Sequence, residues 1–232
     1  MEAVDNFEHL SGFIPEISDN KDKFYMVQLI IRKGTNLNHN NSNRSRTIRT
    51  YQIRDMEHLR EYKKEMMYLC DLTKARAYIN LNARLFTKTA LIAIKLLSDS
   101  IINGHEYNAR AAYSKAIMDC PIKGKKVWLI DLDIKNFESE DQMRVAAVNI
   151  MLTIEHLTER TATIKLNRSK TGLHILSSTF RRDVFIETLQ EPPLELLYGM
   201  DYELKIDSST NLYIPADESI LPNSDQKLIE FP

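Results

Sequence analysis

A short apolar segment that ends in two carboxylates constrains this chain more than any other feature. Residues 127–133 spell VWLIDLD, a pattern typical of a buried strand, with Asp131 and Asp133 at its end. Side chains at positions i and i+2 of a strand point to the same face, so we expect the two carboxylates to lie side by side. Adjacent negative charges repel each other and burial penalises both, so a divalent cation is the expected compensation.

The two aspartates are therefore candidate metal ligands. Carboxylate oxygens suit Mg²⁺ and Mn²⁺, and two such ions about 3.5–4 Å apart are a common device for phosphoryl transfer. A structural alternative stays open, in which one aspartate caps a turn and the other is solvated.

A polar turn that leads into a strand with a histidine follows about forty residues later. Arg168, Ser169 and Lys170 precede Gly172, and His174 lies on the strand. Backbone N–H groups at such a turn, together with the two cations, suit a phosphate group. His174 could then hydrogen-bond a phosphate oxygen. The alternative is a core histidine that a backbone carbonyl satisfies.

The composition is that of an ordinary globular protein. The chain has 232 residues, of which 43% are hydrophobic and 27% are charged. Its two cysteines, Cys70 and Cys120, are far apart, which argues against a zinc module and fits a reducing compartment. The N-terminus lacks a signal-peptide pattern, and the longest apolar run, 90–97, is broken by Lys95. We expect a cytoplasmic protein that does not associate with membranes.

Charge is distributed unevenly although the net charge is only −1. Residues 32–64 contain nine basic residues and three acidic ones, a balance that favours binding to phosphate backbones. The candidate nucleic-acid-binding residues in this window are Arg44, Arg46, Arg49 and Arg54. An ordinary solvated surface is the alternative.

Hydrophobic periodicity predicts a single compact α+β domain. The expected strands are 24–31, 47–53, 75–82, 127–133, 162–166, 173–178, 202–206 and 211–214. The expected helices are 86–102, 106–118, 141–158, 181–189 and one that Asp55 caps and that runs to about Cys70. We expect an irregular lead-in over 1–22, the folded domain over 23–216, and an acidic tail over 217–232.

The two motifs together resemble those of the archaeo-eukaryotic primase superfamily. This family includes primase small subunits, primase-polymerases and the polymerase domain of bacterial end-joining ligases. Its first motif is similar to residues 129–133 (LIDLD), and its second, S-x-x-G-x-H, to residues 169–174 (SKTGLH). Its third motif, a hydrophobic residue followed by an acid, is best matched by Ile206-Asp207, with Asp201 and Asp217 as competitors. The resemblance covers roughly residues 24–215.

The resemblance implies one primase-like catalytic domain with a mixed or antiparallel, RRM-like sheet flanked by helices. Asp131, Asp133 and Asp207 would be catalytic and would ligate Mg²⁺ or Mn²⁺. The nucleotide would be bound by His174, Ser169, Lys170, Arg168 and Arg76, with Tyr78 and Arg84 as further candidates.

The implied reaction is attack of a 3′-hydroxyl on a nucleoside triphosphate, with release of pyrophosphate. The implied partners are nucleoside triphosphates and a DNA primer and template, or RNA. The chain looks like a stand-alone catalytic domain, as some phages and mobile elements encode, in a bacterial or phage-infected cytoplasm. The choice between ribose and deoxyribose stays open, as do the task in replication or repair, the oligomeric state and a helicase partner.

Two other functions are compatible with the motifs. One is a catalytically inactive nucleic-acid-binding protein of the same fold, for which the weak third motif leaves room. The other is a DxD phosphatase of the haloacid dehalogenase type. That site needs Thr or Val two residues after the second aspartate, where this chain has Lys135.

Overall fold

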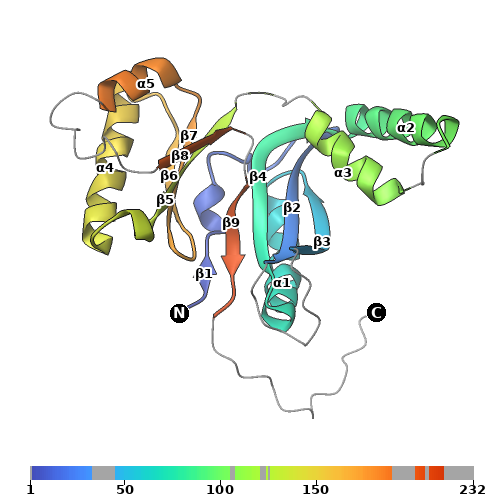
Figure 1. Cartoon of the computed structure of the whole chain (residues 1–232), viewed down its shortest axis with the longest axis horizontal. Helices are drawn as coiled ribbons and strands as arrows, with labels where there is room; N and C mark the ends of the chain where they lie inside the picture. The colour runs from blue at the N-terminus through green and yellow to red at the C-terminus, as the bar shows by residue number, and fades with distance from the viewer. Residues whose placement is uncertain are drawn as a thin grey trace, which may run out of the picture.

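A computed structural model of the chain describes residues 2–32, 45–104, 108–120, 124, 126–189, 202–206 and 209–216 (Figure 1). For residues 202–206 it describes the backbone alone. The described residues form two antiparallel sheets and five α-helices, with their connections. The basic residue Arg44, the proposed third acid Asp207 and the tail 217–232 lie outside the described residues.

The larger sheet has five strands in the order β1-β9-β4-β2-β3. Its strands are β1 (Val4–Asp5), β9 (Ser209–Ile214), β4 (Arg76–Leu85), β2 (Lys23–Ile31) and β3 (Arg46–Ile53). The smaller sheet has four strands in the order β6-β7-β5-β8. Its strands are β6 (Ile164–Arg168), β7 (Gly172–Ser178), β5 (Val127–Asp133) and β8 (Tyr202–Ile206).

The expectation of an α+β fold with antiparallel pairing is confirmed, but the expectation of one sheet is wrong. Strand β9 follows β8 in the chain yet pairs with β4 and β1, so the last strand returns to the first sheet. Strand patterns report which face of a strand is buried and not which strand is its neighbour. The division into two sheets was therefore not visible in the sequence.

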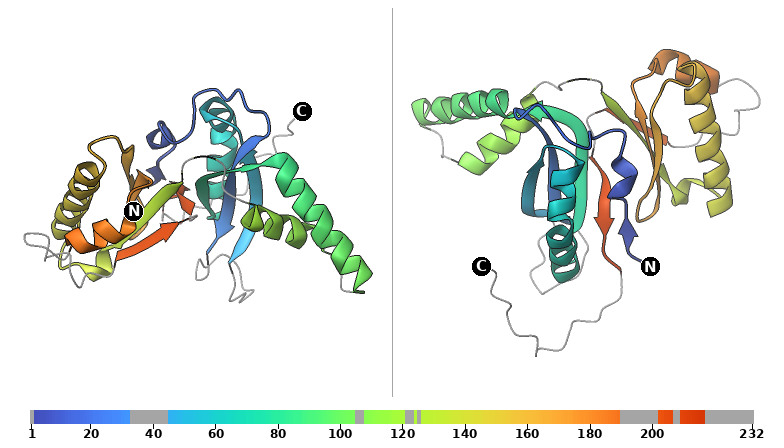
Figure 2. Two further views of the ribbon diagram at one scale, coloured as in Figure 1. Left: turned by 90° about the horizontal axis from the view of Figure 1, so that it is seen from above. Right: turned by 180° about the vertical axis from the view of Figure 1, so that it is seen from behind.

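Helices pack on one face of each sheet, and two further helices project from one end of the molecule. Their bounds are α1 (Met56–Thr73), α2 (Phe86–Ile102), α3 (Ala109–Asp119), α4 (Glu140–Leu157) and α5 (Arg182–Leu189). Helix α1 packs on the five-stranded sheet, and α4 and α5 pack on the four-stranded sheet. Figure 2 shows α2 and α3 projecting from the end of the molecule opposite α4 and α5.

Local signals explain where α1 begins. Asp55 has extended backbone geometry, and its carboxylate accepts a hydrogen bond from the His58 N–H at 2.9 Å, as an N-cap does. The same carboxylate accepts from the Ser18 N–H at 3.1 Å and so ties the N-terminal region to the helix. The predicted capping role of Asp55 is confirmed.

The N-terminal 22 residues are more ordered than the irregular lead-in that we expected. They contain β1 and the 3₁₀ turn η1 (Glu8–Leu10), and Phe7 and Leu10 are fully buried in the core of the larger sheet. A two-residue strand and a three-residue turn are too short to produce a periodic pattern, which explains the difference. Within the described residues, no helix has the length and apolar character needed to span a membrane.

Candidate functional site

The carboxylate pair lies where β5 faces the larger sheet. Ile130 and Leu132 belong to the core under α4, whereas Leu129 packs in the core of the larger sheet. Strand alternation then places Asp131 and Asp133 on the face of Leu129, toward the gap between the sheets. The side chains of both aspartates are about one-third exposed, at 32% and 34%. The predicted side-by-side arrangement is confirmed.

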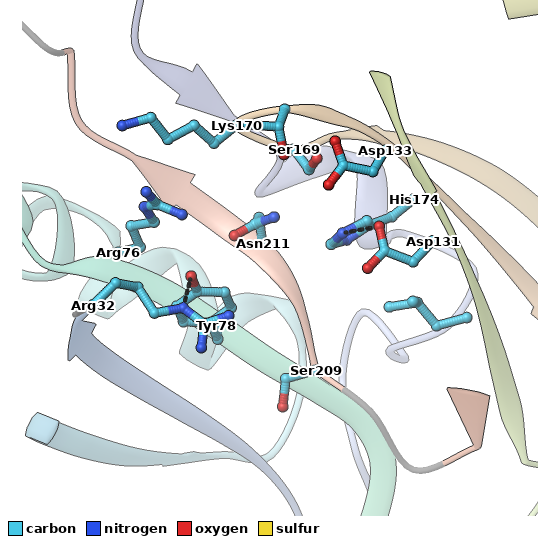
Figure 3. A pocket seen from close by; sticks show the side chains of 12 residues that line it. Arg32, Arg76, Tyr78, Asp131, Asp133, Ser169, Lys170, His174, Ser209 and Asn211 are labelled. Atoms are coloured by element: carbon cyan, nitrogen blue, oxygen red, sulfur yellow. Dashed lines mark hydrogen bonds and ion pairs between the residues drawn. The ribbon is translucent and has the colours of Figure 1, made fainter. Parts of the chain in front are cut away.

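His174 is the register partner of Asp131 in the β5–β7 pair. Its Nε2 lies 3.4 Å from Asp131 Oδ1 (Figure 3). Its Nδ1 lies 3.0 Å from Thr210 Oγ1 on β9. In a neutral ring with the proton on Nε2, the ring donates toward the carboxylate and accepts from the hydroxyl. The imidazole, only 10% exposed, is therefore held by side chains of both sheets rather than by a backbone carbonyl.

The polar turn is pressed against the end of β5. The Ser169 N–H donates to the Gly172 carbonyl at 2.9 Å, and the Ile134 N–H donates to the Thr171 carbonyl at 2.7 Å. A Cβ atom on Gly172 would lie 1.8 Å from the Leu132 carbonyl oxygen, so only glycine fits there. This close approach brings the turn beside Asp133.

The opposite wall of the site comes from the larger sheet. Arg32 follows β2, and Arg76 and Tyr78 lie on β4. The Arg32 Nε donates to the Tyr78 hydroxyl at 2.9 Å, and its guanidinium carbon lies 5.0 Å from the centre of the Tyr78 ring. Such stacking orients the guanidinium and limits its rotamers.

The two walls enclose a polar cavity of about 190 Å³. Its lining residues are Arg32, Arg76, Tyr78, Leu129, Asp131, Asp133, Ser169, Lys170, Thr171, His174, Ser209 and Asn211. Figure 3 shows Arg76 and Asn211 on the side of the cavity opposite Asp131, and Lys170 extending from the turn that carries Ser169. Two carboxylates and three cationic side chains therefore line one small space.

Two buried amide oxygens lie at or beside this cavity without a hydrogen-bond partner among the described residues. They belong to Asn211, which lines the cavity on β9, and to Asn167 on β6. The Asn167 amide group also donates to Thr210 Oγ1 at 3.4 Å. An unsatisfied buried acceptor is costly, and a donor group on a ligand can relieve that cost.

Seven of the predicted site residues line the same cavity. They are Asp131, Asp133, His174, Ser169, Lys170, Arg76 and Tyr78. Arg168 is exposed at the end of β6 and does not line it. Arg84 is buried and donates to the carbonyls of Ile117 at 3.1 Å and Asn82 at 2.8 Å, which is a structural role.

The basic residues of β3 lie elsewhere. Arg49 is paired with Glu65 of α1 at 2.6 Å, and its register partner Leu29 belongs to the core under α1. Arg46 and Arg54 are exposed, and neither lines the cavity. The structure thus does not bring Arg46, Arg49 or Arg54 to the carboxylates, and their binding to nucleic acid stays a prediction.

Sequence reasoning missed several residues that complete the site. Arg32 was counted only as part of a basic window, and Ser209 and Asn211 were not considered. Each reaches the cavity from the larger sheet. Its position there depends on the pairing of strands that are far apart in the sequence. The alternation of β2 up to Ile31 was the one available signal, because it predicts which side of the sheet the following residues face.

A third acid also emerges from the register of β8. Glu203 is the register partner of Asp131 in the β5–β8 pair, and the sequence analysis did not consider it. Asp207, the predicted third ligand, lies outside the described residues. Within the part of the chain that the structure describes, no group of three or more His, Cys, Asp or Glu side chains could hold a metal ion.

Comparison of the chain with protein-family models, with curated proteins and with solved structures finds no match in any of the three. The resemblance carried by the motifs at 129–133 and 169–174 therefore stays a prediction. What can be said about function rests on the geometry and the charge of the cavity.

Proposed function

We propose that the chain is a metal-dependent nucleotidyltransferase of the primase-polymerase type. It would add nucleotides to a 3′-hydroxyl on a nucleic-acid template. The observation that carries this proposal is the charge composition of the cavity, in which Asp131 and Asp133 line the same space of about 190 Å³ as Arg76 and Lys170. Carboxylates suit the cations that accompany a triphosphate, and the arginine and lysine suit its phosphate oxygens.

The donor set fits a hard divalent cation. Asp131 and Asp133 offer partly exposed carboxylate oxygens on one face of β5, and no thiolate lines the cavity. Mg²⁺ or Mn²⁺, when bound there, would neutralise charge on the phosphates and favour ionisation of the attacking hydroxyl. The chain itself would hold the two carboxylates in parallel through the pairing of β5 with β7.

The three cationic side chains of the cavity would bind and orient the phosphates. Arg76 and Lys170 offer donors from opposite sheets, and Arg32 is oriented by its stacking on Tyr78. Positioning and charge neutralisation account for most of the catalysis of phosphoryl transfer, and both need preorganised donors. The pairing of Arg32 with Tyr78 provides that preorganisation on one side.

His174 would position the carboxylate and contact the ligand. Its ring contacts both Thr210 and Asp131, so it fixes one oxygen of that carboxylate. The ring also lines the cavity, so it would lie beside a bound phosphate. The contact with Thr210 would support both roles.

The size of the cavity limits what it encloses. Pockets that bury a whole drug-sized ligand usually measure about 300–1,000 Å³. A cavity of about 190 Å³ suits the polyphosphate of a nucleotide and leaves the sugar and base outside it. This is compatible with a base that pairs with a template beyond the cavity.

The third carboxylate would come from Asp207, as the resemblance implies, or from Glu203. The backbone of Glu203 is the register partner of Asp131, and Tyr202-Glu203 has the same hydrophobic-acid order as Ile206-Asp207. A primer-extension assay separates the two candidates, because only substitution of the true ligand, by Asp207→Asn or by Glu203→Gln, should abolish incorporation.

Primer extension tests the proposal as a whole. Purified protein with a primed template, nucleotides and Mn²⁺ should extend the primer, and chelation of the metal should stop the reaction. Asp131→Asn and Asp133→Asn should abolish extension while the unfolding midpoint is unchanged or higher, because the repulsion between the carboxylates is relieved. Asp141→Asn, which removes an exposed carboxylate in the first turn of α4, is the matched control.

The inactive nucleic-acid-binding protein is the second candidate function. The observation that favours it is that the described residues offer only two clustered carboxylates rather than three. It predicts nucleic-acid binding without incorporation under any metal. If wild-type protein neither extends a primer nor binds a nucleoside triphosphate in titration, the nucleotidyltransferase proposal fails.

A further inference from the structure

The two walls of the cavity are joined through one buried side chain from the N-terminal region. Asn6 directly follows β1, and its side-chain amide donates two hydrogen bonds of 2.9 Å each, to the Arg168 carbonyl and to the Asn211 carbonyl. Arg168 immediately precedes the turn that carries Ser169 and Lys170. Asn211 lies on the opposite wall, on β9.

We propose that Asn6 is a positioning residue, which sets the spacing between the phosphate-binding turn and β9 and thereby the affinity of the cavity for its ligand. The inference rests on the proposed function in so far as the ligand is a nucleoside triphosphate. It extends that function to a residue that touches neither the carboxylates nor the cavity.

Asn6 is itself held rigidly. Its backbone N–H donates to the Leu212 carbonyl at 3.0 Å, and the residue is only 2% exposed. On one side, Val4 and Asp5 pair with β9; on the other, Phe7 is fully buried in the core. A side chain anchored on both sides can transmit the position of β9 to the turn, whereas a mobile one could not.

Both bonds end on backbone carbonyl oxygens, so they help to fix the position of the backbone that carries the site residues. The Arg168 carbonyl is one residue from Ser169 and two from Lys170, so a shift there moves the whole turn. Misplacement of a binding group by about 1 Å can cost about 10²-fold in rate, even when the change lies outside the site. The loss of Asn6 would remove both of these bonds at once.

A second asparagine supplies a matched control at the far end of β5. Asn82 on β4 accepts from the Val127 N–H at 2.8 Å and donates to the Val127 carbonyl at 3.2 Å. It is also 2% exposed and also joins the two sheets. Val127 is six residues from Asp133, about 20 Å along an extended strand. Asn6 and Asn82 therefore make comparable links, of which only the first is near the cavity.

The first experiment compares Asn6→Ala with Asn82→Ala. Both variants should lower the urea midpoint to a similar extent, because each loses two side-chain hydrogen bonds at a contact between the sheets. Only Asn6→Ala should weaken binding of a nucleoside triphosphate with Mg²⁺, by about tenfold or more, whereas Asn82→Ala should change the Kd less than twofold. Equal changes in affinity for the two variants would overturn the proposal.

The second experiment does not depend on nucleotide binding. Amide hydrogen exchange in the free protein should become faster at Ser169 and Ile134 in Asn6→Ala, and at Val127 in Asn82→Ala. Unchanged exchange at Ser169 in Asn6→Ala would refute the positioning role even if affinity fell. A wild-type protein that binds no nucleotide but shows the expected exchange pattern would refute the proposed function alone.

A variant of equal size separates the hydrogen-bond donors from the volume of the side chain. Asn6→Asp keeps the volume of the side chain but replaces the donors with carboxylate oxygens, which the two carbonyls repel. It should weaken triphosphate binding at least as much as Asn6→Ala. Wild-type affinity in Asn6→Asp would overturn the inference.

Discussion

His174 on β7 and Asp131 on β5 are register partners whose side chains meet, with Nε2 3.4 Å from Oδ1. Their contact joins the two motifs, which are about forty residues apart in the chain, into one site. Thr210 completes the arrangement from the other sheet at 3.0 Å from Nδ1. The histidine is therefore a point at which β5, β7 and β9 converge.

Removal of the imidazole should impair catalysis more than folding. We expect His174→Ala to lower kcat/KM for nucleotide incorporation by about 10²-fold or more, the usual cost of losing one preorganised donor at a reacting group. His156→Ala, near the C-terminal end of α4, should leave kcat/KM unchanged. If His174→Ala retains wild-type kcat/KM in steady-state extension assays, the ring has only a structural role.

Loss of a cationic side chain of the cavity should have a separate effect, on ligand affinity. Lys170→Ala and Arg76→Ala should each raise the Kd of a nucleoside triphosphate about tenfold or more, because each removes a charge-assisted hydrogen bond worth about 1.5–3 kcal/mol. Isothermal titration at fixed Mg²⁺ measures this change.

The control for these two substitutions is Arg49→Ala. Arg49 forms an ion pair with Glu65 and does not line the cavity, so its loss should not change the affinity for the triphosphate. A Kd that rises equally in Arg49→Ala would show that general charge, rather than the cavity, attracts the ligand.

The local elements were predictable to within a few residues. The expected strand 127–133 and helix 86–102 match β5 (Val127–Asp133) and α2 (Phe86–Ile102). The alternation of polar and apolar residues also predicted that Asp131 and Asp133 share a face. These features depend on neighbours in sequence, so the sequence contains the information that they need.

The assembly of the site was not predictable in the same way. Asn6 and Arg168 are 162 residues apart, and the His174–Thr210 contact joins strands of different sheets. No periodic pattern encodes such pairings, because they depend on which strands become neighbours. Glu203 was missed for the same reason, since only the register of β8 against β5 places it opposite Asp131.

Alkaline pH should destabilise the fold through buried acidic groups. Burial, together with the neighbouring Asp71 charge, raises the pKa of the Cys70 thiol from 9.0 to about 12. Burial likewise raises the pKa of Tyr51 and Tyr213. The unfolded chain therefore loses these protons first, so stability is complete below about pH 9 and falls as the pH rises toward 12.

Urea unfolding at several pH values measures this effect. Cys70 alone should reduce the free energy of unfolding by roughly 1 kcal/mol between pH 8 and pH 10. Cys70→Ala should be less stable at every pH because of the cavity, but its stability should fall less steeply over that interval. Parallel curves for the two proteins would contradict the prediction.

Gly172 should tolerate no side chain, because the turn depends on its closeness to β5. A Cβ atom there would lie 1.8 Å from the Leu132 carbonyl oxygen and 3.1 Å from Asp133 Cα, and both obstacles are backbone. Gly172→Ala should therefore lower the free energy of unfolding by at least about 2 kcal/mol and displace the turn from Asp133.

Gly104→Ala is the control for this substitution. Gly104 has a φ of +64° but nothing within 4 Å of its virtual Cβ, so the variant should lose only about 1 kcal/mol from backbone strain. Urea unfolding ranks the two variants, and triphosphate titration should show weaker binding in Gly172→Ala alone. If Gly172→Ala is as stable as Gly104→Ala and binds normally, the turn does not need its close approach to β5.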